Sequence, residues 1–535
     1  MAAFTLQMAT KVFNKQRLLR CMLSHRVRWT LHAEGDPSMA SQAMLKLQLA
    51  PRYNAAFRRL IEASAAIAGT RTTQIREYYD TPAMALNQQG IALCLQQTAG
   101  EWQQLLLQTG PERDGLHHQR ELSIAIPDPA LKIEQFPHGK ARRFLSKKSI
   151  SSTLQPIFTV SLKHDCWVLR DEQDNLLEIC LERGKLKGIG WSEQINTVNI
   201  TLKQGKNAAL FAFALRLADK LPVCPTLQDT VAKGCMQAAG NAGLPVGARL
   251  PALSPDMSLQ QVLQLLVQEI LRHLQGNVPG VLRGEEMEYV HQARVALRRL
   301  RTVLAAFAAI LPPDSRHVIT LDVQWLSNSL GQLRDVDVFL TETLPTIETT
   351  MYPMADFATL YAALQSHRAH CRDSVHAALC SPRYGTLLLR LLACLHTNTA
   401  RSPIKLRQLA GHALSRPWKS LISLAGQWET LSQVQRHDLR KRAKRLRYTL
   451  EFFSPPLPHK AVLRTLKQLH CLQLVLGKMN DSAVALTLLA RLGEDNAELA
   501  NSVGLVAGWL AYEAHCKLEK QAQVIKKLSH MPTCW

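Results

Sequence analysis

Basic side chains recur at helical spacing in two places in the C-terminal half of the chain. In each place a histidine and three basic residues stand at positions i, i+3, i+7 and i+10, so they share one face of a helix, and Lys441 lies beside the second set. At 1.5 Å per residue such a row is about 15 Å long. We call these sets the first row and the second row. The first row is His291, Arg294, Arg298 and Arg301, and the second is His437, Arg440, Lys441, Lys444 and Arg447.

The two rows belong to an internal repeat with a constant offset of 146 positions. Apolar residues, a glycine and an aspartate also recur at this offset. In both copies the aspartate lies 44 residues after the histidine of the row. The matched pairs include Leu304 with Leu450, Phe307 with Phe453, Gly331 with Gly477, and Asp335 with Asp481. Such a repeat predicts two helical bundles related by a pseudo-two-fold axis.

A row of charge on a helix is usually a solvated face, and that is the simplest interpretation here. Solvated faces, however, normally alternate acidic and basic residues. The first row has no acidic residue between Val290 and Ala309, and six of the eight residues Arg440–Arg447 are basic. Like charges three and four positions apart cost a few tenths of a kcal/mol per pair. Because both copies carry this cost, we expect an anion to offset it.

The repeated aspartates, Asp335 and Asp481, follow turn-like segments and have two possible roles. Asp335 together with Asp337 could form a metal site. We favour a supporting role instead, in which Asp335 and Asp481 cap a helix or orient an arginine of the rows.

The elements that position these residues can be outlined from composition. The 535 residues carry a net charge of +22 and are 47% hydrophobic, so the chain can bury large cores and its partner is expected to be an anion. There is no apolar run long enough for a membrane span. The 12 scattered cysteines lack metal-site spacing, so we expect reduced thiols in a cytoplasmic protein.

Four segments are expected along the chain. Residues 1–38 are basic and resemble a transit peptide in composition, but we expect a disordered extension or an upstream start. Short alternating runs with helices at Arg52–Ala68 and Asn207–Lys220 predict an antiparallel α+β domain over 43–220. A linker rich in proline and glycine follows at 221–257. Residues 258–530 show helical periodicity, with repeat halves at about 258–400 and 401–530.

The helical half closely resembles the CHAD domain, the conserved-histidine α-helical domain. The resemblance rests on His-x-x-Arg-Val-Ala-x-Arg-Arg-Leu-Arg from His291, on Leu-Gly-x-x-Arg-Asp-x-Asp-Val from Leu330, and on His-Asp-Leu-Arg-Lys-x-x-Lys-Arg-Leu-Arg-Tyr from His437. It implies two four-helix bundles with a basic cleft that binds inorganic polyphosphate. The two rows would line that cleft.

The first half resembles a degenerate CYTH domain, the triphosphate-tunnel fold. The resemblance rests on Tyr-Tyr-Asp-Thr-Pro from Tyr78 and Gly-Ile-Ala-Leu from Gly90. Catalytic members hold Mg²⁺ or Mn²⁺ with glutamates on the first strand and a late strand. Here Gln42–Lys46 keeps only the lysine, and Thr197–Thr201 has no carboxylate. Possible vestiges of the tunnel site are Lys46, Arg120, Glu121, Arg170, Glu178 and Glu182.

These observations predict a polyphosphate-binding protein whose first half is a non-catalytic scaffold, with no cofactor. The alternative is an inorganic triphosphatase of the tunnel type, which would require Mg²⁺ or Mn²⁺. A second alternative is nucleic-acid binding, although Tyr448 is the only aromatic residue at the second row to stack on a base.

Overall fold

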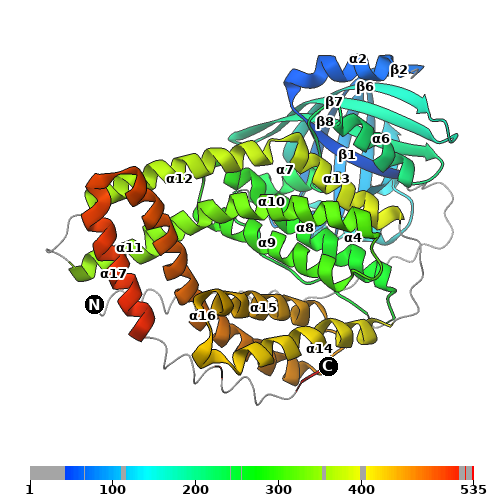
Figure 1. Ribbon diagram of the computed structural model, residues 1–535. Coiled ribbons are helices and arrows are strands. Elements are labelled where there is room, and N and C mark those ends of the chain that lie inside the picture. The colour runs from blue at the N-terminus through cyan, green and yellow to red at the C-terminus, as the bar shows by residue number, and fades with distance from the viewer. Residues whose placement is uncertain are drawn as a thin grey trace. The chain divides into compact units, whose positions relative to one another are not determined.

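The computed structural model describes residues 42–64, 67–109, 116–240, 243–254, 256–351, 357–397, 405–516, 525 and 533–535. An antiparallel sheet is followed by a long series of helices, so the predicted α+β architecture is confirmed (Figure 1). The extension expected at 1–38 lies outside the described residues. In the part of the chain that is described, no helix is both long and apolar enough to span a membrane.

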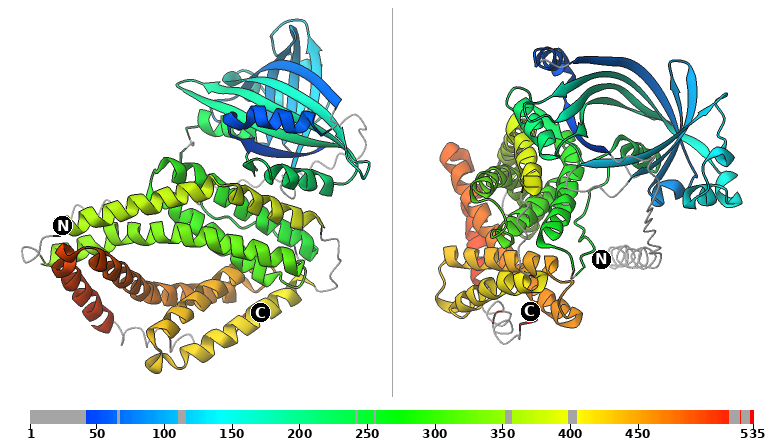
Figure 2. Two further views of the ribbon diagram at one scale, coloured as in Figure 1. Left: turned by 45° about the horizontal axis from the view of Figure 1, so that its top comes forward. Right: turned by 90° about the vertical axis from the view of Figure 1, so that its right-hand side faces the viewer.

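In the part of the chain that is described, nine strands form the sheet in the order β5-β4-β3-β2-β6-β7-β8-β1-β9. β1 also pairs with β5, and this pairing closes the sheet into a ring, whose inner side we call the tunnel (Figure 2). The strands are β1 (Gln42–Leu49), β2 (Ile67–Asp80), β3 (Ile91–Thr98), β4 (Glu101–Thr109), β5 (His117–Ile126), β6 (Gln155–Arg170), β7 (Leu176–Gly188), β8 (Trp191–Gln204) and β9 (Val223–Pro225).

The two faces of the ring differ because side chains alternate along each strand. Leu45, Leu47 and Leu49 of β1 are buried in the core that includes helix α6 (Ala208–Ala218). Lys46 lies between them in sequence and points to the opposite, inner face, where it is buried to 6% exposure. Any binding or catalytic residues of the tunnel must therefore lie on the inner face.

The Tyr-Tyr-Asp-Thr-Pro motif has a structural role at the end of β2. The buried carboxylate of Asp80 accepts hydrogen bonds from the backbone N–H groups of Thr81, Leu86 and Asn87, at 2.7, 2.9 and 2.9 Å. These bonds satisfy backbone donors at the start of the short helix α3 (Ala85–Gln88). The motif therefore fixes the turn between β2 and β3.

One predicted helix is wrong in its extent, and the long strand that follows it was missed. The helix expected over Arg52–Ala68 is limited to α2 (Asn54–Glu62), and β2 begins at Ile67. β2 pairs with both β3 and β6, so it is an internal strand. Its sequence is mostly polar because its inner-face residues line the tunnel, and it therefore lacked the apolar signal of a strand.

The range 221–257, expected to be a linker, contains two further elements. β9 pairs with β1, and α7 (Thr230–Ala238) packs against the inner face of the sheet. Val231 and Cys235 of α7 are buried beside Phe158 and Leu186. A Cβ atom at Gly234 would lie 2.5 Å from the Phe158 ring, so glycine allows this close approach. Helix α7 therefore fills part of the tunnel.

The helical region reproduces the repeat in its element boundaries. α9 and α15 have the same length, and the offset of 146 takes both ends of α9 to the ends of α15 and the start of α10 to the start of α16. The arrangement as two four-helix bundles remains a prediction. The remaining helices are α4 (Lys140–Leu145), α5 (Lys148–Ser151), α8 (Leu259–Arg283), α9 (Met287–Ala306), α10 (Pro313–Val338), α11 (Leu344–Met351), α12 (Ala358–Leu379), α13 (Pro382–Thr397), α14 (Leu406–Ala425), α15 (Gln433–Phe452), α16 (His459–Asp495) and α17 (Ala500–Cys516).

Candidate functional site

Helices α9 and α15 carry the two rows, and they contact each other. Phe307 directly follows α9 and Phe453 directly follows α15, and their rings stack with centroids 5.8 Å apart. Arg298 of the first row lies 3.3 Å from the hydroxyl of Tyr448 on α15, through its Nη1 atom. The structure thus brings together helices that lie almost 150 residues apart in the sequence.

Arg294 lies among several other cations of the two rows. Burial lowers the pKa of its guanidinium, and the charges of Arg298, Arg334 and Arg440 lower it further, against the opposing effect of Asp335. Arg440 belongs to the second row and Arg298 to the first. Like charges from both rows therefore act on one guanidinium, which raises the free energy of the unliganded site.

Two contacts orient Arg294. Its Nη1 atom lies 3.6 Å from a carboxylate oxygen of Asp335 and 3.3 Å from the carbonyl oxygen of Leu330, both on α10. A Cβ atom at Gly331 would approach that Nη1 atom to 3.0 Å, so glycine leaves room for the guanidinium. Asp335 is thus placed beside a row arginine, whereas the side chain of its counterpart Asp481, on α16, lies outside the described residues.

Asp337, the other half of the metal pair considered from the sequence, points elsewhere. It is 1% exposed and accepts a hydrogen bond of 2.6 Å from Nε of Arg368 on α12. Asp335 and Asp337 therefore face different arginines. Within the ranges that the structure describes, there is no group of three or more His, Cys, Asp or Glu side chains that could hold a metal ion.

His291 lies at the start of the first row and is half-buried. Burial lowers the pKa of its imidazole, Glu288 raises it, and the charges of Arg334, Arg298 and Arg294 lower it. The neutral form is therefore favoured while no anion is bound. An anion beside the imidazole would act in the opposite direction and raise the pKa.

The remaining row residues differ in their exposure and contacts. Arg301 and Lys441 are exposed, and His437, Arg440 and Lys444 are half-buried. Arg447 is drawn toward Glu451, with Nε 3.6 Å from the carboxylate, and its guanidinium lies over the Tyr448 ring. The second row is therefore partly neutralised at its C-terminal end.

Two arginines of this region were not among the predicted site residues. Arg334 acts electrostatically on both His291 and Arg294, and it belongs to the Leu-Gly-x-x-Arg-Asp motif, so the signal was present in the sequence. Arg299 lies within the basic run but is 2% exposed. It donates a 2.8 Å hydrogen bond to the Arg249 carbonyl oxygen and lies over the Phe452 ring, so its contacts are internal.

In the tunnel, the surviving charged residues are paired with one another. Glu178 forms a 2.9 Å ion pair with Lys203, and Lys46 lies 3.9 Å from Asp229 beside α7. Glu182 lies 3.5 Å from His164 and accepts a hydrogen bond of 3.2 Å from Thr197. Burial lowers the pKa of His164, although Glu182 opposes this effect.

Three further predicted vestiges have separate positions. Glu121 lies 3.9 Å from Arg76, an inner-face arginine that also donates a 2.7 Å hydrogen bond to Gln96. Arg170 is exposed at the end of β6 and pairs with Asp174, so it does not belong to the tunnel site. Arg120 lies on β5, and its side chain is outside the described residues.

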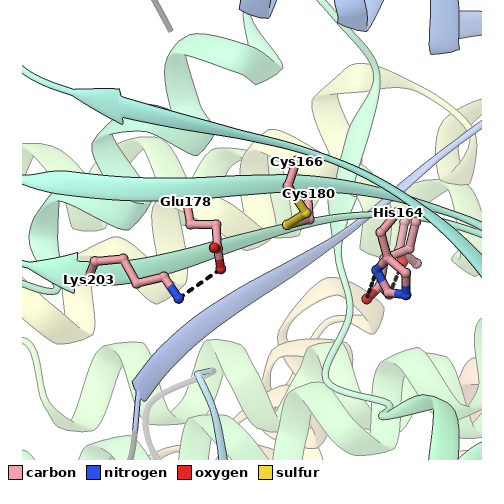
Figure 3. The surroundings of a disulfide bond; sticks show 7 residues. His164, Cys166, Glu178, Cys180 and Lys203 are labelled. Carbon is pink, nitrogen blue, oxygen red and sulfur yellow. Dashed lines mark hydrogen bonds and ion pairs between the residues drawn. A yellow bond between two sulfur atoms is a disulfide. The ribbon is translucent and has the colours of Figure 1, made fainter. Parts of the chain in front are cut away.

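A disulfide bond between Cys166 and Cys180 corrects the expectation that all cysteines are reduced. The two residues are directly opposite on β6 and β7, with Cα atoms 4.1 Å apart. The disulfide lies between the Glu178–Lys203 pair and His164 (Figure 3). The inner face there is thus occupied by a neutral cross-link flanked by paired charges.

Comparisons with known proteins identify the helical region. The CHAD domain model matches residues 265–490. The crystal structure of the CHAD domain from the plant Ricinus communis is 30% identical, covers 55% of this chain and 100% of its own, and has a TM-score of 0.50.

The other similarities are more limited. An inorganic triphosphatase from Haemophilus influenzae is 28% identical over 137 residues, which is 25% of this chain and 38% of that protein. The chain thus spans well under half the length of this relative. A candidate adenylate cyclase from Bacillus halodurans is 19% identical, covers 36% of this chain and 97% of its own, and has a TM-score of 0.27.

Both regions can now be assigned. The closed antiparallel sheet, with its Tyr-Tyr-Asp-Thr-Pro and Gly-Ile-Ala-Leu motifs in order, resembles the CYTH fold. The helical region matches the CHAD domain in its motifs and over the full length of a solved relative. The chain belongs to the CHAD domain family.

Proposed function

We propose that this protein binds inorganic polyphosphate along the rows of α9 and α15. The observation that carries the proposal is the position of Arg294, whose charge is opposed by Arg298 of its own row and by Arg440 of the other. Stacked like charges destabilise the empty site, and a polyanion lying between the helices would reverse that effect. A chain of phosphates also suits a linear row of guanidinium and ammonium groups.

The tunnel, in this proposal, is a non-catalytic scaffold. Metal-assisted phosphoryl transfer needs several carboxylate oxygens around a divalent ion. The inner-face carboxylates of Glu178 and Glu182 are instead engaged by Lys203, His164 and Thr197. The apolar side chains of α7 also take up part of the space that a triphosphate would need. The paired charges and the filled volume both argue against turnover.

The decisive experiment compares two double charge reversals with the same change in net charge. R298E/K444E places a glutamate in each row, and we expect it to weaken binding of long-chain polyphosphate roughly 100-fold or more, because two charge-assisted contacts are lost. R407E/K419E changes two exposed residues of α14 and should leave binding unchanged. Equal affinity of R298E/K444E and the wild-type protein would disprove the site.

Salt dependence provides a second measurement on the same proteins. Binding that releases counterions weakens linearly with the logarithm of salt concentration, and the slope reflects the number of neutralised phosphates. We expect a steep slope for the wild-type protein and for R407E/K419E, and a shallower slope for R298E/K444E. A slope near zero for the wild-type protein would contradict polyphosphate binding by the rows.

Inorganic triphosphatase activity is the second candidate, because a relative over part of the chain carries that name. It predicts phosphate release from tripolyphosphate that depends on Mg²⁺ or Mn²⁺ and is lost in E178A/E182A. The R407E/K419E protein serves as the control for handling and folding. Release at the background level with either metal would remove this candidate.

Nucleic-acid binding is a third possibility that rests on the net charge of +22 alone. Competition separates it from polyphosphate binding. We expect unlabelled polyphosphate to displace labelled single-stranded RNA at a low competitor concentration, counted in phosphate groups. Unlabelled RNA should need a higher concentration to displace labelled polyphosphate. The opposite order would favour nucleic acid as the ligand of the rows.

A further inference from the structure

A cavity of about 720 Å³ lies beside the N-terminal end of α15. Its walls come from α10, α12, α15 and α16. This volume is in the range of pockets that enclose a small organic ligand, which are mostly apolar with a few well-placed polar groups. The cavity is distinct from the rows but shares one residue with them, His437, the first residue of the second row.

The lining of the cavity has two chemical characters. Leu476, Val484 and Leu488 of α16 provide apolar walls. Arg436, Arg491 and His367 provide positive or protonatable groups. His367 and Arg491 are close enough that the Arg491 charge lowers the pKa of the imidazole, after the larger effect of burial and that of His370. A bare phosphate chain would use only the cationic part of this lining.

Neutral polar groups complete the lining. Gln332 and Gln433 offer amides, and Ser482 and Thr487 offer hydroxyl groups. An alkyl chain would leave the donors and acceptors that it covers without partners, which costs free energy. A ring system with heteroatoms and a sugar would satisfy them while also covering the apolar walls. These groups favour a nucleoside over a lipid tail as the enclosed part.

We propose that this cavity binds the nucleoside part of a nucleoside triphosphate whose phosphates extend onto the second row. His437 is the junction, because it lines the cavity and also begins the row that continues through Arg440 and Lys444. Asp335 also lines the cavity, and Arg294 compensates its charge at 3.6 Å. The inference rests on the proposed phosphate binding by the rows and adds a second class of ligand to it.

The test compares ATP with inorganic tripolyphosphate by calorimetry in the presence of EDTA. Both ligands carry three phosphates, and only ATP carries a nucleoside. We expect ATP to bind about tenfold more tightly, since a partly enclosed nucleoside contributes at least the 1.4 kcal/mol that a factor of ten represents. If ATP binds no more tightly than tripolyphosphate, the inference is wrong, whereas the proposed function stands as long as long-chain polyphosphate binds.

Two matched variants locate the effect. Ala483 lines the cavity, whereas Ala490 is exposed on the same helix and does not line it. A483W should abolish the preference for ATP and keep tripolyphosphate binding, and A490W should keep both. Preference for ATP that persists in A483W would overturn the cavity assignment. R298E/K444E should weaken the binding of both ATP and tripolyphosphate. If it does not, the proposed phosphate binding by the rows fails, and this result is distinct from a loss of the preference for ATP.

Photo-crosslinking covers the case in which A483W does not fold. Wild-type protein is irradiated with 8-azido-ATP, and the labelled peptides are identified by mass spectrometry. We expect labels in the segments 433–437 and 482–491, and their loss when excess ATP is present. Competable labelling only in the N-terminal sheet would place the nucleotide in the tunnel and disprove the inference.

Discussion

Phe307 and Phe453 occupy equivalent positions of the repeat and stack on each other, with ring centroids 5.8 Å apart and planes inclined by 22°. The two copies of the repeat therefore meet at the C-terminal ends of α9 and α15. Each phenylalanine is 16 residues beyond the histidine of its row, a distance of about 24 Å along a helix. Each row therefore ends closer to this aromatic contact than it begins.

The aromatic pair should couple the two copies energetically. We expect F307L and F453L to destabilise the helical region individually, with a coupling of about 0.5–1.5 kcal/mol in a double-mutant cycle. Urea unfolding monitored by far-UV circular dichroism provides the four free energies. The pair F307L and F57L, with Phe57 in α2, should be additive. Additive effects for F307L and F453L would contradict an energetic contact.

The equivalent glycines Gly331 and Gly477 should respond differently to the same substitution. Replacing glycine by alanine inside a helix stabilises it by up to about 1 kcal/mol. Among the residues whose side chains are described, no atom lies within 4 Å of a Cβ placed at Gly477, so G477A should give this gain without affecting binding. In G331A the new methyl group displaces Arg294, so polyphosphate affinity should fall several-fold. Isothermal calorimetry and urea unfolding measure both quantities, and equal behaviour of the two variants would refute the steric argument.

Polyphosphate binding should take up protons. The pKa of His291 is lowered in the free protein, first by burial and then by nearby arginines, and a bound polyanion would raise it. Affinity should therefore increase as the pH falls through the range below 6.5. Calorimetry in buffers with different ionisation enthalpies measures the uptake. H291Q should reduce it, and H138Q, at an exposed histidine of the sheet region, should not. A wild-type affinity that is independent of pH would exclude this coupling.

Acid should destabilise the helical region through His273. This residue is fully buried on α8, and burial, with a further contribution from the Arg299 charge, lowers its pKa to about 4. The unfolded chain, with a histidine pKa near 6.5, then binds more protons than the folded chain between these values. Protonation of His273 therefore does not lower the free energy of unfolding above pH 6.5, and it lowers it by about 3 kcal/mol as the pH approaches 4. In H273Q, which keeps a polar group near Gln292, unfolding free energy should change less with pH. An unchanged pH profile in H273Q would assign the acid sensitivity to other groups.

The disulfide should have a modest effect on stability. A cross-link closing a loop of this size contributes at most about 3 kcal/mol. Cys166 and Cys180 belong to strands that are paired along 12 register positions, so their separation is restricted even without it. Reduction should lower the melting temperature by a few degrees and leave polyphosphate affinity unchanged. C166S/C180S should melt at the same temperature with and without reductant. Intact-mass analysis that finds two free thiols in non-reduced protein would contradict the cross-link.

The sequence predicted most reliably those features that depend on local periodicity. The existence of helices at α9 and α15 followed from basic and apolar residues at helical spacing, and the duplicated motifs identified the family. β2 was missed because its residues alternate between the tunnel and the outer face without a clear apolar pattern. α7 was assigned to a linker because the surrounding prolines and glycines masked a short helix.

Features that depend on tertiary contacts were harder to predict from the sequence. Arg299 and Arg298 are adjacent in a basic run, and only packing against Phe452 shows that Arg299 is internal. The spacing of Cys166 and Cys180 carries no signal, because their pairing is set by the register between β6 and β7. The Arg334 position, in contrast, was readable from its motif and was overlooked as a contributor to the cationic site.

Helix α7 has a further consequence for any molecule that would enter the tunnel. Val231 and Cys235 already cover apolar inner-face residues, and Asp229 already lies beside Lys46. An entering molecule must compete with a segment of the same chain, whose effective concentration is on the order of millimolar and does not fall on dilution. Its apparent affinity is the intrinsic affinity multiplied by the fraction of molecules in which α7 has moved away. A ligand of the tunnel would thus be measured as weak even if its direct contacts were strong.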